Sequence, residues 1–215
     1  GYDDASMNDD EFVSQAEKME IPAAIGVDEN GKKQMIDIAN LPHLLVGGST
    51  GQGKSSVGNA ILCSAMETKS PEDLEVDLID PKQVEYGPYA DMPHVRKSVT
   101  NGSDADAIGL LQENIDEMKH RNDFFKALSE KHGVTIKDLN GYKKFRAAHP
   151  EMNLPNIKRR LVGIEEVANY AQDPKVFAEV TNRIKQLGAL ARSAGIHLIA
   201  TTQDPKKETV GDIKA

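Results

Sequence analysis

Residues 43–55 read His-Leu-Leu-Val-Gly-Gly-Ser-Thr-Gly-Gln-Gly-Lys-Ser, and this stretch decides the fold of the chain. Its first four residues form the short apolar burst of a buried strand, and a glycine-rich turn follows. From Gly48 to Ser55 the chain matches the pattern G-x-x-x-x-G-K-[ST] at every fixed position. Residues 54–68 are compatible with a helix, so the stretch predicts a strand, a loop and a helix in succession.

The loop is predicted to bind the phosphates of a nucleotide. Its glycines let the backbone curl until successive N–H groups face one anion, and the following helix adds the positive end of its dipole. We expect Lys54 to reach the β- and γ-phosphates and the Ser55 hydroxyl to coordinate Mg²⁺. The alternative, an ordinary glycine- and serine-rich turn, is disfavoured by the flanking strand and helix. The expected nucleotide contacts are Gly48, Ser49, Thr50, Gly51, Gln52, Gly53, Lys54, Ser55 and Ser56.

Strands and helices alternate through the rest of the chain. Apolar segments predict further strands at 76–79, 94–99, 161–164 and 196–200. Helical patterns predict helices at 104–129, 136–148 and 174–193, the first with Ser103 as its N-cap and the last with Gly195 at its C′ position. This alternation predicts an α/β fold in which a mostly parallel sheet is flanked by helices.

The N-terminal part has a different pattern. Short alternations at 23–27 and 35–38 enclose Asn30-Gly31, a pair typical of a tight turn, and predict a β-hairpin. Residues 1–20 carry seven acidic side chains and one lysine, a local charge of −6, and are expected to be a mobile extension or a lead-in. We therefore expect an acidic extension at 1–20, the hairpin at 21–40 and the main domain at 41–215.

Composition excludes several classes of protein. The 215 residues include 26 Lys and Arg against 34 Asp and Glu, a net charge of −8, so the chain is not a uniformly basic nucleic-acid binder. No apolar run approaches the roughly 18 residues of a membrane span, and the start does not resemble a secretory signal. Cys63 is the single cysteine, so no internal disulfide can form. A reducing, cytoplasmic location is expected.

A second acidic site is predicted beside the phosphate loop. Glu165 and Glu166 directly follow the strand at 161–164, and we expect Glu165 in the magnesium shell and Glu166 on the attacking water. The alternative is that both simply favour the start of the next helix. Asp80, at the end of the strand at 76–79, is a rival for the metal. Gln203, after the strand at 196–200, is a candidate to sense the γ-phosphate or to position water, with a solvated loop position as its alternative.

Taken together, these motifs resemble the FtsK/SpoIIIE family of motor ATPases. The resemblance covers residues 41–215 and rests on the motifs 48–55, Asp80-Pro81-Lys82, 117–121, 165–168, 191–198 and 200–203 in their order. It implies a RecA-like P-loop NTPase core, binding of ATP and Mg²⁺, assembly into a hexameric ring, and movement of double-stranded DNA through the central pore. It also implies that Glu165 stands at the Walker B position, that Glu166 is the catalytic glutamate, and that Gln203 is the polar sensor.

The sequence departs from the family pattern at three points. Glu165 replaces the usual aspartate, which adds one methylene at the metal shell. Asp204 stands where the family has an arginine, and the chain stops where the family continues into further strands. In a ring the site is expected to be completed by an arginine from the neighbouring subunit, and Arg121 and Arg192 are both candidates.

The DNA-binding surface is expected among the basic residues between Lys119 and Arg160, where the local charge is +7. A solvated basic face is the alternative reading of this cluster. One alternative function is an ATPase of a secretion or conjugation system, with poor hydrolysis and possible membrane-anchored partners; another is a small-molecule kinase. The candidate DNA contacts are Lys143, Lys144, Arg146, Lys158, Arg159 and Arg160.

Overall fold

The computed structural model of the chain describes residues 14, 17–40, 43–47, 52–81, 89–100 and 102–202. Within these ranges, only the backbone is described at 24–27, 33, 40, 43–47, 52–57, 59–60, 189 and 202. In the described part, no helix is both long enough and apolar enough to cross a membrane.

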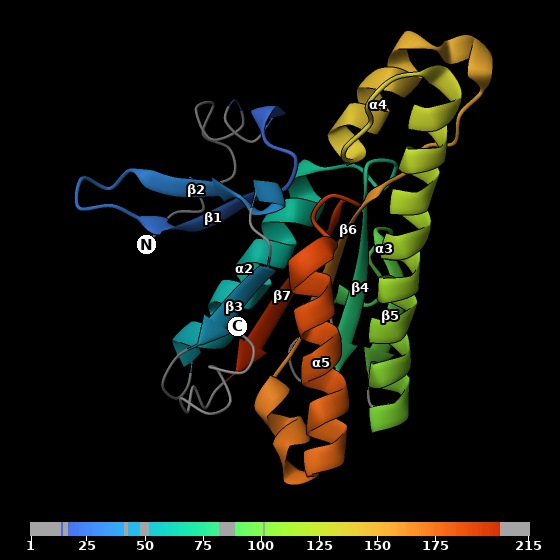
Figure 1. The fold of residues 1–215 in the computed structure, drawn as a ribbon. Coiled ribbons are helices and arrows are strands. Elements are labelled where there is room, and N and C mark those ends of the chain that lie inside the picture. The colour runs from blue at the N-terminus through green and yellow to red at the C-terminus, as the bar shows by residue number, and fades with distance from the viewer. Residues whose placement is uncertain are drawn as a thin grey trace.

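A parallel sheet forms the centre of the molecule (Figure 1). Across the described residues it has five strands in the order β3-β7-β6-β4-β5, and every neighbouring pair is parallel. The predicted parallel sheet is therefore confirmed, with strand ends that differ from the predicted ones by a residue or two. The strands are β3 (His43–Gly47), β4 (Leu74–Asp80), β5 (Val95–Thr100), β6 (Arg159–Ile164) and β7 (Ile196–Thr202).

Helices cover both faces of this sheet (Figure 1). Alternate residues of each strand point to opposite faces, so Ile79 and Ile164 pack with α3 and α5, whereas Leu78 and Leu161 pack with α2. Coverage of both faces explains why β6 is buried along its whole length. The helices are α2 (Gln52–Thr68), α3 (Asp104–His132), α4 (Leu139–Ala148) and α5 (Pro174–Leu190), with short 3₁₀ turns η1 (Ile38–Asn40), η3 (Pro150–Met152) and η4 (Val167–Gln172).

The predicted hairpin is confirmed as β1 (Pro22–Val27) and β2 (Lys33–Asp37), which pair antiparallel. Gly31 has φ +77°, the positive value that the turn requires. At the base of the hairpin, Ile21 and Ile38 share a core with α2 and the sheet. The carboxylate of Asp37 fixes its base by accepting the backbone N–H groups of Glu20, Ile21 and Ala39 at 3.0 Å.

The helix ends follow local capping chemistry. Ser103 caps α3 in a reciprocal capping box with Asp106, and α3 ends at His132, three residues beyond the predicted end, with Gly133 as its left-handed C-cap. Asp138 caps α4, which therefore begins three residues later than predicted. The prediction for Gly195 is wrong: α5 ends at Leu190, and Gly195 (φ +75°) instead closes the turn that leads into β7.

A helical protrusion extends from the end of the sheet where the parallel strands begin (Figure 1). It comprises the C-terminal part of α3, α4 and η3, and it has a small core of its own that includes Phe125, Leu128 and Tyr142. Phe125 and Tyr142 stack with ring centroids 5.3 Å apart. This protrusion carries three of the six residues that the sequence assigns to DNA, namely Lys143, Lys144 and Arg146.

A buried polar network joins α3 to three strands. Asp77 of β4 is fully buried. Its carboxylate accepts two hydrogen bonds from Arg96 of β5, at 3.0 and 2.7 Å, and one from the side-chain amide of Asn114 of α3, at 2.9 Å. Asn114 in turn accepts Arg160 of β6 at 3.1 Å, and Arg160 donates to Glu75 at 2.8 Å. Because buried charges are costly unless they are paired and hydrogen-bonded, each member holds the next in place.

Candidate nucleotide site

The chain enters the predicted phosphate loop from β3 and leaves it into α2. β3 ends at Gly47 and α2 begins at Gln52, so the strand and helix expected around the loop are both present. The four loop residues from 48 to 51 lie outside the described residues. The expected contacts Gln52, Gly53, Lys54, Ser55 and Ser56 occupy the start of α2, where only the backbone is described.

The sheet register brings the acidic residues close to this loop. β7 lies between β3 and β6, with Gly47 opposite Thr202 on one side and Ile164 opposite Ala200 on the other. Glu165 and Glu166 therefore leave the sheet one strand away from the loop. Functional groups in parallel sheets gather at this carboxyl edge, so the predicted placement of the two acids is supported by the topology.

Thr201 forms hydrogen bonds to both acids from β7, the strand that lies between β6 and the strand leading into the loop. Its hydroxyl donates to Oε2 of Glu165 at 2.6 Å, a short bond typical of an O–H group facing a carboxylate. The hydroxyl oxygen of Thr201 also accepts a hydrogen bond from the backbone N–H of Glu166 at 3.0 Å. Thr201 is 1% exposed and Glu165 6%, so both sit in a dry, preformed arrangement.

Glu166 has an unusual backbone conformation. Its φ of +55° and ψ of +69° lie in the left-handed region. Glycine adopts this region readily and Asn and Asp do so at a small cost, whereas for other residues, including glutamate, it is unfavourable. Such strain is concentrated at functional sites. The regular strand ends here and η4 begins at the next residue. Glu165 is buried whereas Glu166 remains half exposed, so Glu166 has access to water.

Asp80 and Tyr170 lie beside the acids. Asp80 ends β4, is 1% exposed, and follows Ile79, whose carbonyl accepts the backbone N–H of Glu165 at 2.8 Å. The Tyr170 hydroxyl is buried, and its burial, with the nearby carboxylates of Asp104 and Asp80, raises the pKa of the phenol. Tyr170 therefore stays protonated. In the part of the chain that the structure describes, this hydroxyl has no hydrogen-bond partner.

The donor set fits magnesium held jointly with a nucleotide. Mg²⁺ keeps several waters and is usually bound by one or two carboxylates together with substrate phosphates. Among the described side chains, no group of three or more His, Cys, Asp or Glu converges as a self-sufficient metal site. The buried carboxylate of Glu165, one strand from the phosphate loop, fits a site in which the protein and the nucleotide phosphates bind Mg²⁺ together.

Arg121, one candidate for an arginine that acts on a neighbouring subunit, does not fit that role. It is 3% exposed, and it donates to Glu117 at 2.9 Å and to the carbonyls of Lys158 and Ala194 at 2.8 and 2.9 Å. Its remaining nitrogen faces Glu75 at 3.3 Å. Arg121 is thus a structural residue of its own subunit. Arg192, the other candidate, is exposed.

Two residues of the expected DNA surface must also be removed from it. Arg159 is 4% exposed and bonds to Glu20, Asn140 and His197, while Arg160 is 5% exposed and belongs to the polar network described above. A run of basic residues suggested a surface, but both occupy the buried strand β6. His197 is an acceptor for Arg159, so its proton is on Nδ1.

The other four basic residues remain accessible to different degrees. Lys144 and Arg146 are exposed on α4, and Lys158 is partly buried. Lys143 is half-buried and pairs with Glu20 at 3.5 Å. Gln203, the expected sensor, lies outside the described residues, as does Lys82. The sequence places Thr201 among the polar residues at the end of β7, but it gives no sign that Thr201 holds the two acids.

In the part of the chain that the structure describes, the sheet is all parallel, the G-x-x-x-x-G-K-[ST] motif follows its edge strand β3, and the acids lie at a strand end one strand away. These features define a RecA-like P-loop ATPase. Within this class the comparison with family models is specific. The chain matches the FtsK/SpoIIIE family over residues 10–207 and belongs to that family, so the resemblance seen in the motifs is confirmed.

Curated relatives support the same placement. The chain is 33% identical over 196 residues to the DNA translocase FtsK of Borreliella burgdorferi, covering 91% of this chain and 24% of the relative. It is 34% identical over 203 residues to the DNA translocase FtsK of Listeria monocytogenes, covering 93% and 25%. The chain thus spans about a quarter of the length of these relatives.

Solved structures share the fold. The conjugation coupling protein TcpA of pCW3 superposes with a TM-score of 0.70 at 24% identity, over 96% of this chain and 54% of TcpA. The cytoplasmic domain of the type VII secretion ATPase EccC from Thermomonospora curvata gives a TM-score of 0.66 at 23% identity, over 90% and 22% of the two chains. At these identities the likeness concerns the fold alone.

Proposed function

We propose that this chain is the ATP-driven motor domain of a double-stranded DNA translocase that works as a ring, in the transfer of chromosomal or plasmid DNA. The observation that carries the proposal is the acid pair fixed by Thr201 at the carboxyl edge, one strand from the phosphate loop. The curated relatives, which are named DNA translocases, favour DNA as the cargo. We place the domain in the cytoplasm or at the cytoplasmic face of a membrane.

Each residue of the site has a distinct role in this proposal. Residues 48–56 bind the phosphates of ATP, with Lys54 on the β- and γ-phosphates and Ser55 on the metal side. Glu165, held by Thr201, supplies a carboxylate to the magnesium shell, and Glu166 accepts the proton of the attacking water. Gln203 contacts the γ-phosphate or the water. Bound Mg²⁺ would neutralise charge on the β- and γ-phosphates.

The longer side chain at Glu165 is accommodated by its partner. A glutamate reaches one methylene further than the aspartate of the family pattern, and the Thr201 hydroxyl holds the end of that longer side chain in one position. Glu165→Asp would withdraw the carboxylate from Thr201. We expect weaker hydrolysis in this variant and unchanged ATP affinity, because the phosphate loop provides most of the binding.

The DNA contacts of the proposal are Lys143, Lys144, Arg146 and Lys158. The two exposed residues Lys144 and Arg146 are the most direct test; Arg146 also donates one hydrogen bond, from Nε to the carbonyl of Leu154 at 2.9 Å. Lys144→Glu combined with Arg146→Glu should remove DNA stimulation of ATP hydrolysis and spare basal turnover. As a matched control, Lys126→Glu with Lys131→Glu changes the charge equally on α3; equal loss from both pairs would reject a specific surface.

Ring assembly is proposed to place Arg192 at the nucleotide of the neighbouring subunit, since Arg192 is the exposed candidate. A variant that lacks this arginine should lower the ATPase of mixed rings by more than its share of the chains, because each variant subunit also disables the site of its neighbour. If mixtures of wild-type and Arg192→Ala chains simply average their activities, Arg192 does not act across subunits.

A second candidate function is an ATPase of a conjugation or secretion system that binds ATP and hydrolyses it slowly. The net charge of −8 and the fold shared with TcpA and EccC favour it. The deciding experiment measures ATP hydrolysis with and without duplex DNA, with Lys54→Ala as the inactive control. A several-fold stimulation by DNA supports the translocase, whereas tight ATP binding with slow turnover and no response to DNA supports the second candidate.

A further inference from the structure

The Tyr170 hydroxyl is a buried donor at the edge of the sheet that carries the acids. Its side chain is 3% exposed, and among the described residues its oxygen has no hydrogen-bond partner. Burying a polar group without a hydrogen bond is costly, and most buried polar groups in folded proteins are bonded. Phenylalanine would fill the same space without this cost, so the hydroxyl points to a use other than packing.

The ring of Tyr170 anchors the turn that follows the acids. Tyr170 lies on η4, which starts directly after Glu166, and Val167 precedes it by three residues. Side chains three residues apart lie on one face of a 3₁₀ turn, and both are buried in the core formed with α3 and α5. The backbone N–H of Asn169 also donates to the carbonyl of Glu166 at 3.1 Å. The position of η4 therefore bears directly on the strained backbone of Glu166.

Two carboxylates near the hydroxyl differ in their surroundings. Burial, together with the nearby carboxylates of Asp104 and Asp80, raises the pKa of Tyr170, so the hydroxyl remains a donor. Asp104 is exposed in the first turn of α3, where water and the helix dipole stabilise its charge. Asp80 is 1% exposed, and a carboxylate can accept several hydrogen bonds. Because a buried charge depends on hydrogen bonds, Asp80 is the acceptor that a further donor stabilises more.

Asp80 is also a neighbour of the proposed metal ligand. Ile79 of β4 pairs with Ile164 of β6, so Asp80 and Glu165 leave the sheet side by side. The backbone N–H of Glu165 donates to the carbonyl of Ile79 at 2.8 Å. Glu165 is thus joined to the end of β4 by this bond and to η4 through Glu166. Binding at Glu165 therefore acts on the donor and on the acceptor together.

We propose that Tyr170 is a positioning residue of the nucleotide site, whose hydroxyl donates to the Asp80 carboxylate when ATP and Mg²⁺ bind. This bond ties η4 to the end of β4 and so fixes Glu166 for the attacking water. The inference rests on the proposed roles of Glu165 and Glu166. Tyr170 acts through Glu166 and does not itself touch the reacting atoms.

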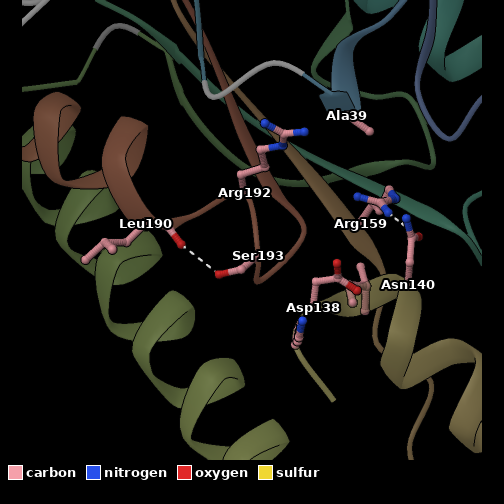
Figure 2. Close-up of a pocket in the computed structure, with 9 residues that line it drawn as sticks. Ala39, Asp138, Asn140, Arg159, Leu190, Arg192 and Ser193 are labelled. Atoms are coloured by element: carbon pink, nitrogen blue, oxygen red, sulfur yellow. Dashed lines mark hydrogen bonds between the residues drawn. The ribbon is translucent and has the colours of Figure 1, made fainter. Parts of the chain in front are cut away.

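Tyr142 provides a matched control at the other end of β6. It is fully buried, but its hydroxyl already donates to the carbonyl of Pro155. Figure 2 shows the start of α4, the helix that carries Tyr142, where Asn140 is hydrogen-bonded to Arg159. Arg159 begins β6, whereas the acids follow the last residue of this strand. The hydroxyls of Tyr142 and Tyr170 therefore report on opposite ends of the sheet.

Thermal unfolding of the full chain, with and without ligand, tests the proposal. Without ligand, Tyr170→Phe should unfold at the wild-type temperature or a few degrees above it, because it removes a buried hydroxyl that has no bond. Tyr142→Phe, which loses a bond, should unfold a few degrees lower. Titration with Mg²⁺ and AMP-PNP, a nonhydrolysable ATP analogue, should show an affinity about ten-fold weaker in Tyr170→Phe, the loss expected for one hydrogen bond to a charged acceptor. The affinity of Tyr142→Phe should equal that of the wild type.

A double-mutant cycle identifies the acceptor. In a chain that already carries Asp80→Ala, adding Tyr170→Phe should weaken the binding of Mg²⁺ and AMP-PNP by less than about two-fold, because the bond is already lost. A full ten-fold loss in this background would overturn the assignment to Asp80. Should Asp80→Ala fold poorly, the contrast between the two tyrosine variants remains the test.

The outcomes separate this inference from the proposed function. A wild-type chain that responds to Mg²⁺ and AMP-PNP no more than Lys54→Ala does would overturn both. If the wild type responds and Tyr170→Phe binds the analogue equally well, only the role of Tyr170 is overturned. The same holds if Tyr170→Phe without ligand is destabilised as much as Tyr142→Phe, since the hydroxyl would then have a structural partner.

Discussion

Replacing Thr201 with valine tests whether this hydroxyl holds the two acids in place. Valine keeps the shape of threonine but can neither donate to Oε2 of Glu165 nor accept the N–H of Glu166. A buried group left without its hydrogen bond costs about 1–3 kcal/mol, and a charged acceptor lies at the upper end of this range. With Thr201 only 1% exposed, we expect Thr201→Val to lower the free energy of unfolding by about 2–4 kcal/mol.

Thr201→Ser is the matched control, because it keeps the hydroxyl and loses one methyl group, at a cost of about 1 kcal/mol. Urea denaturation of both variants gives the two free energies, and ATP turnover of the same samples reports the position of the acids. We expect Thr201→Val to lose most of its turnover and Thr201→Ser to retain it. If valine is no more destabilising than serine, and turnover falls equally in both, the hydroxyl does not organise the site.

Three further predictions follow from backbone strain and charge. Glu166→Gly should abolish hydrolysis yet be more stable than Glu166→Ala by about 1 kcal/mol, because glycine alone adopts φ +55° without strain. Gly195→Ala should lower the free energy of unfolding by well over the roughly 1 kcal/mol expected for Gly31→Ala. Both glycines have positive φ, but only at Gly195 would the added Cβ overlap the side chain of Leu139, and thermal unfolding compares the two variants. Burial raises the pKa of Glu20, but the nearby charges of Lys143 and Arg159 outweigh burial and lower the pKa below 4.5. The ion pairs of Glu20 therefore stabilise the fold above pH 4.5. This stabilisation is lost as the pH falls through the lowered pKa of Glu20.

Each of these has a clear opposing outcome. Equal stability of the glycine and alanine variants at position 166 would show that the left-handed conformation is unstrained. Equal cost at positions 195 and 31 would show that the loop around Gly195 yields easily. For Glu20, the Glu20→Gln chain should be less stable than the wild type at pH 7 and equal to it in strong acid; a difference that is constant with pH would refute the ion pairing.

The fold was largely predictable because one motif fixed the start of the sheet and apolar runs marked the other strands. The strand and helix around residue 50 have strong local signals, and the parallel order follows from the alternation of elements. Helix ends were harder. The predicted end of α3 falls short of its cap Gly133, and the predicted start of α4 lies before its cap Asp138, because the buried residue Ile136 belongs to the core of the protrusion and not to the helix.

The basic residues of β6 show why the surface was harder to predict than the fold. Arg159 and Arg160 lie in a run of positive charge, and a run of charge usually faces water. Their burial depends on partners distant in sequence, such as Glu75 for Arg160 and Glu20 for Arg159. A sign was present in β4, where Glu75 and Asp77 interrupt an otherwise apolar strand and so require cationic or amide partners.

The acid pair of the site was predictable in place but not in its support. Glu165 and Glu166 were found because acids after a buried strand meet at the carboxyl edge of a parallel sheet. The role of Thr201 depends on β7 lying directly beside β6, an order that sequence alone does not give. The same holds for Tyr170, whose hydroxyl lies near Asp80 only because η4 folds back after Glu166.

The polar network around Asp77 sets how this molecule can move. Asn114 takes part in hydrogen bonds to both Asp77 and Arg160, so α3 cannot slide along the sheet or rotate about its axis without breaking several buried bonds at once. The sheet and α3, which is 29 residues long, must then move together. Because Tyr142 of α4 packs on Phe125 of α3, a displacement of the sheet that carries α3 would also move α4.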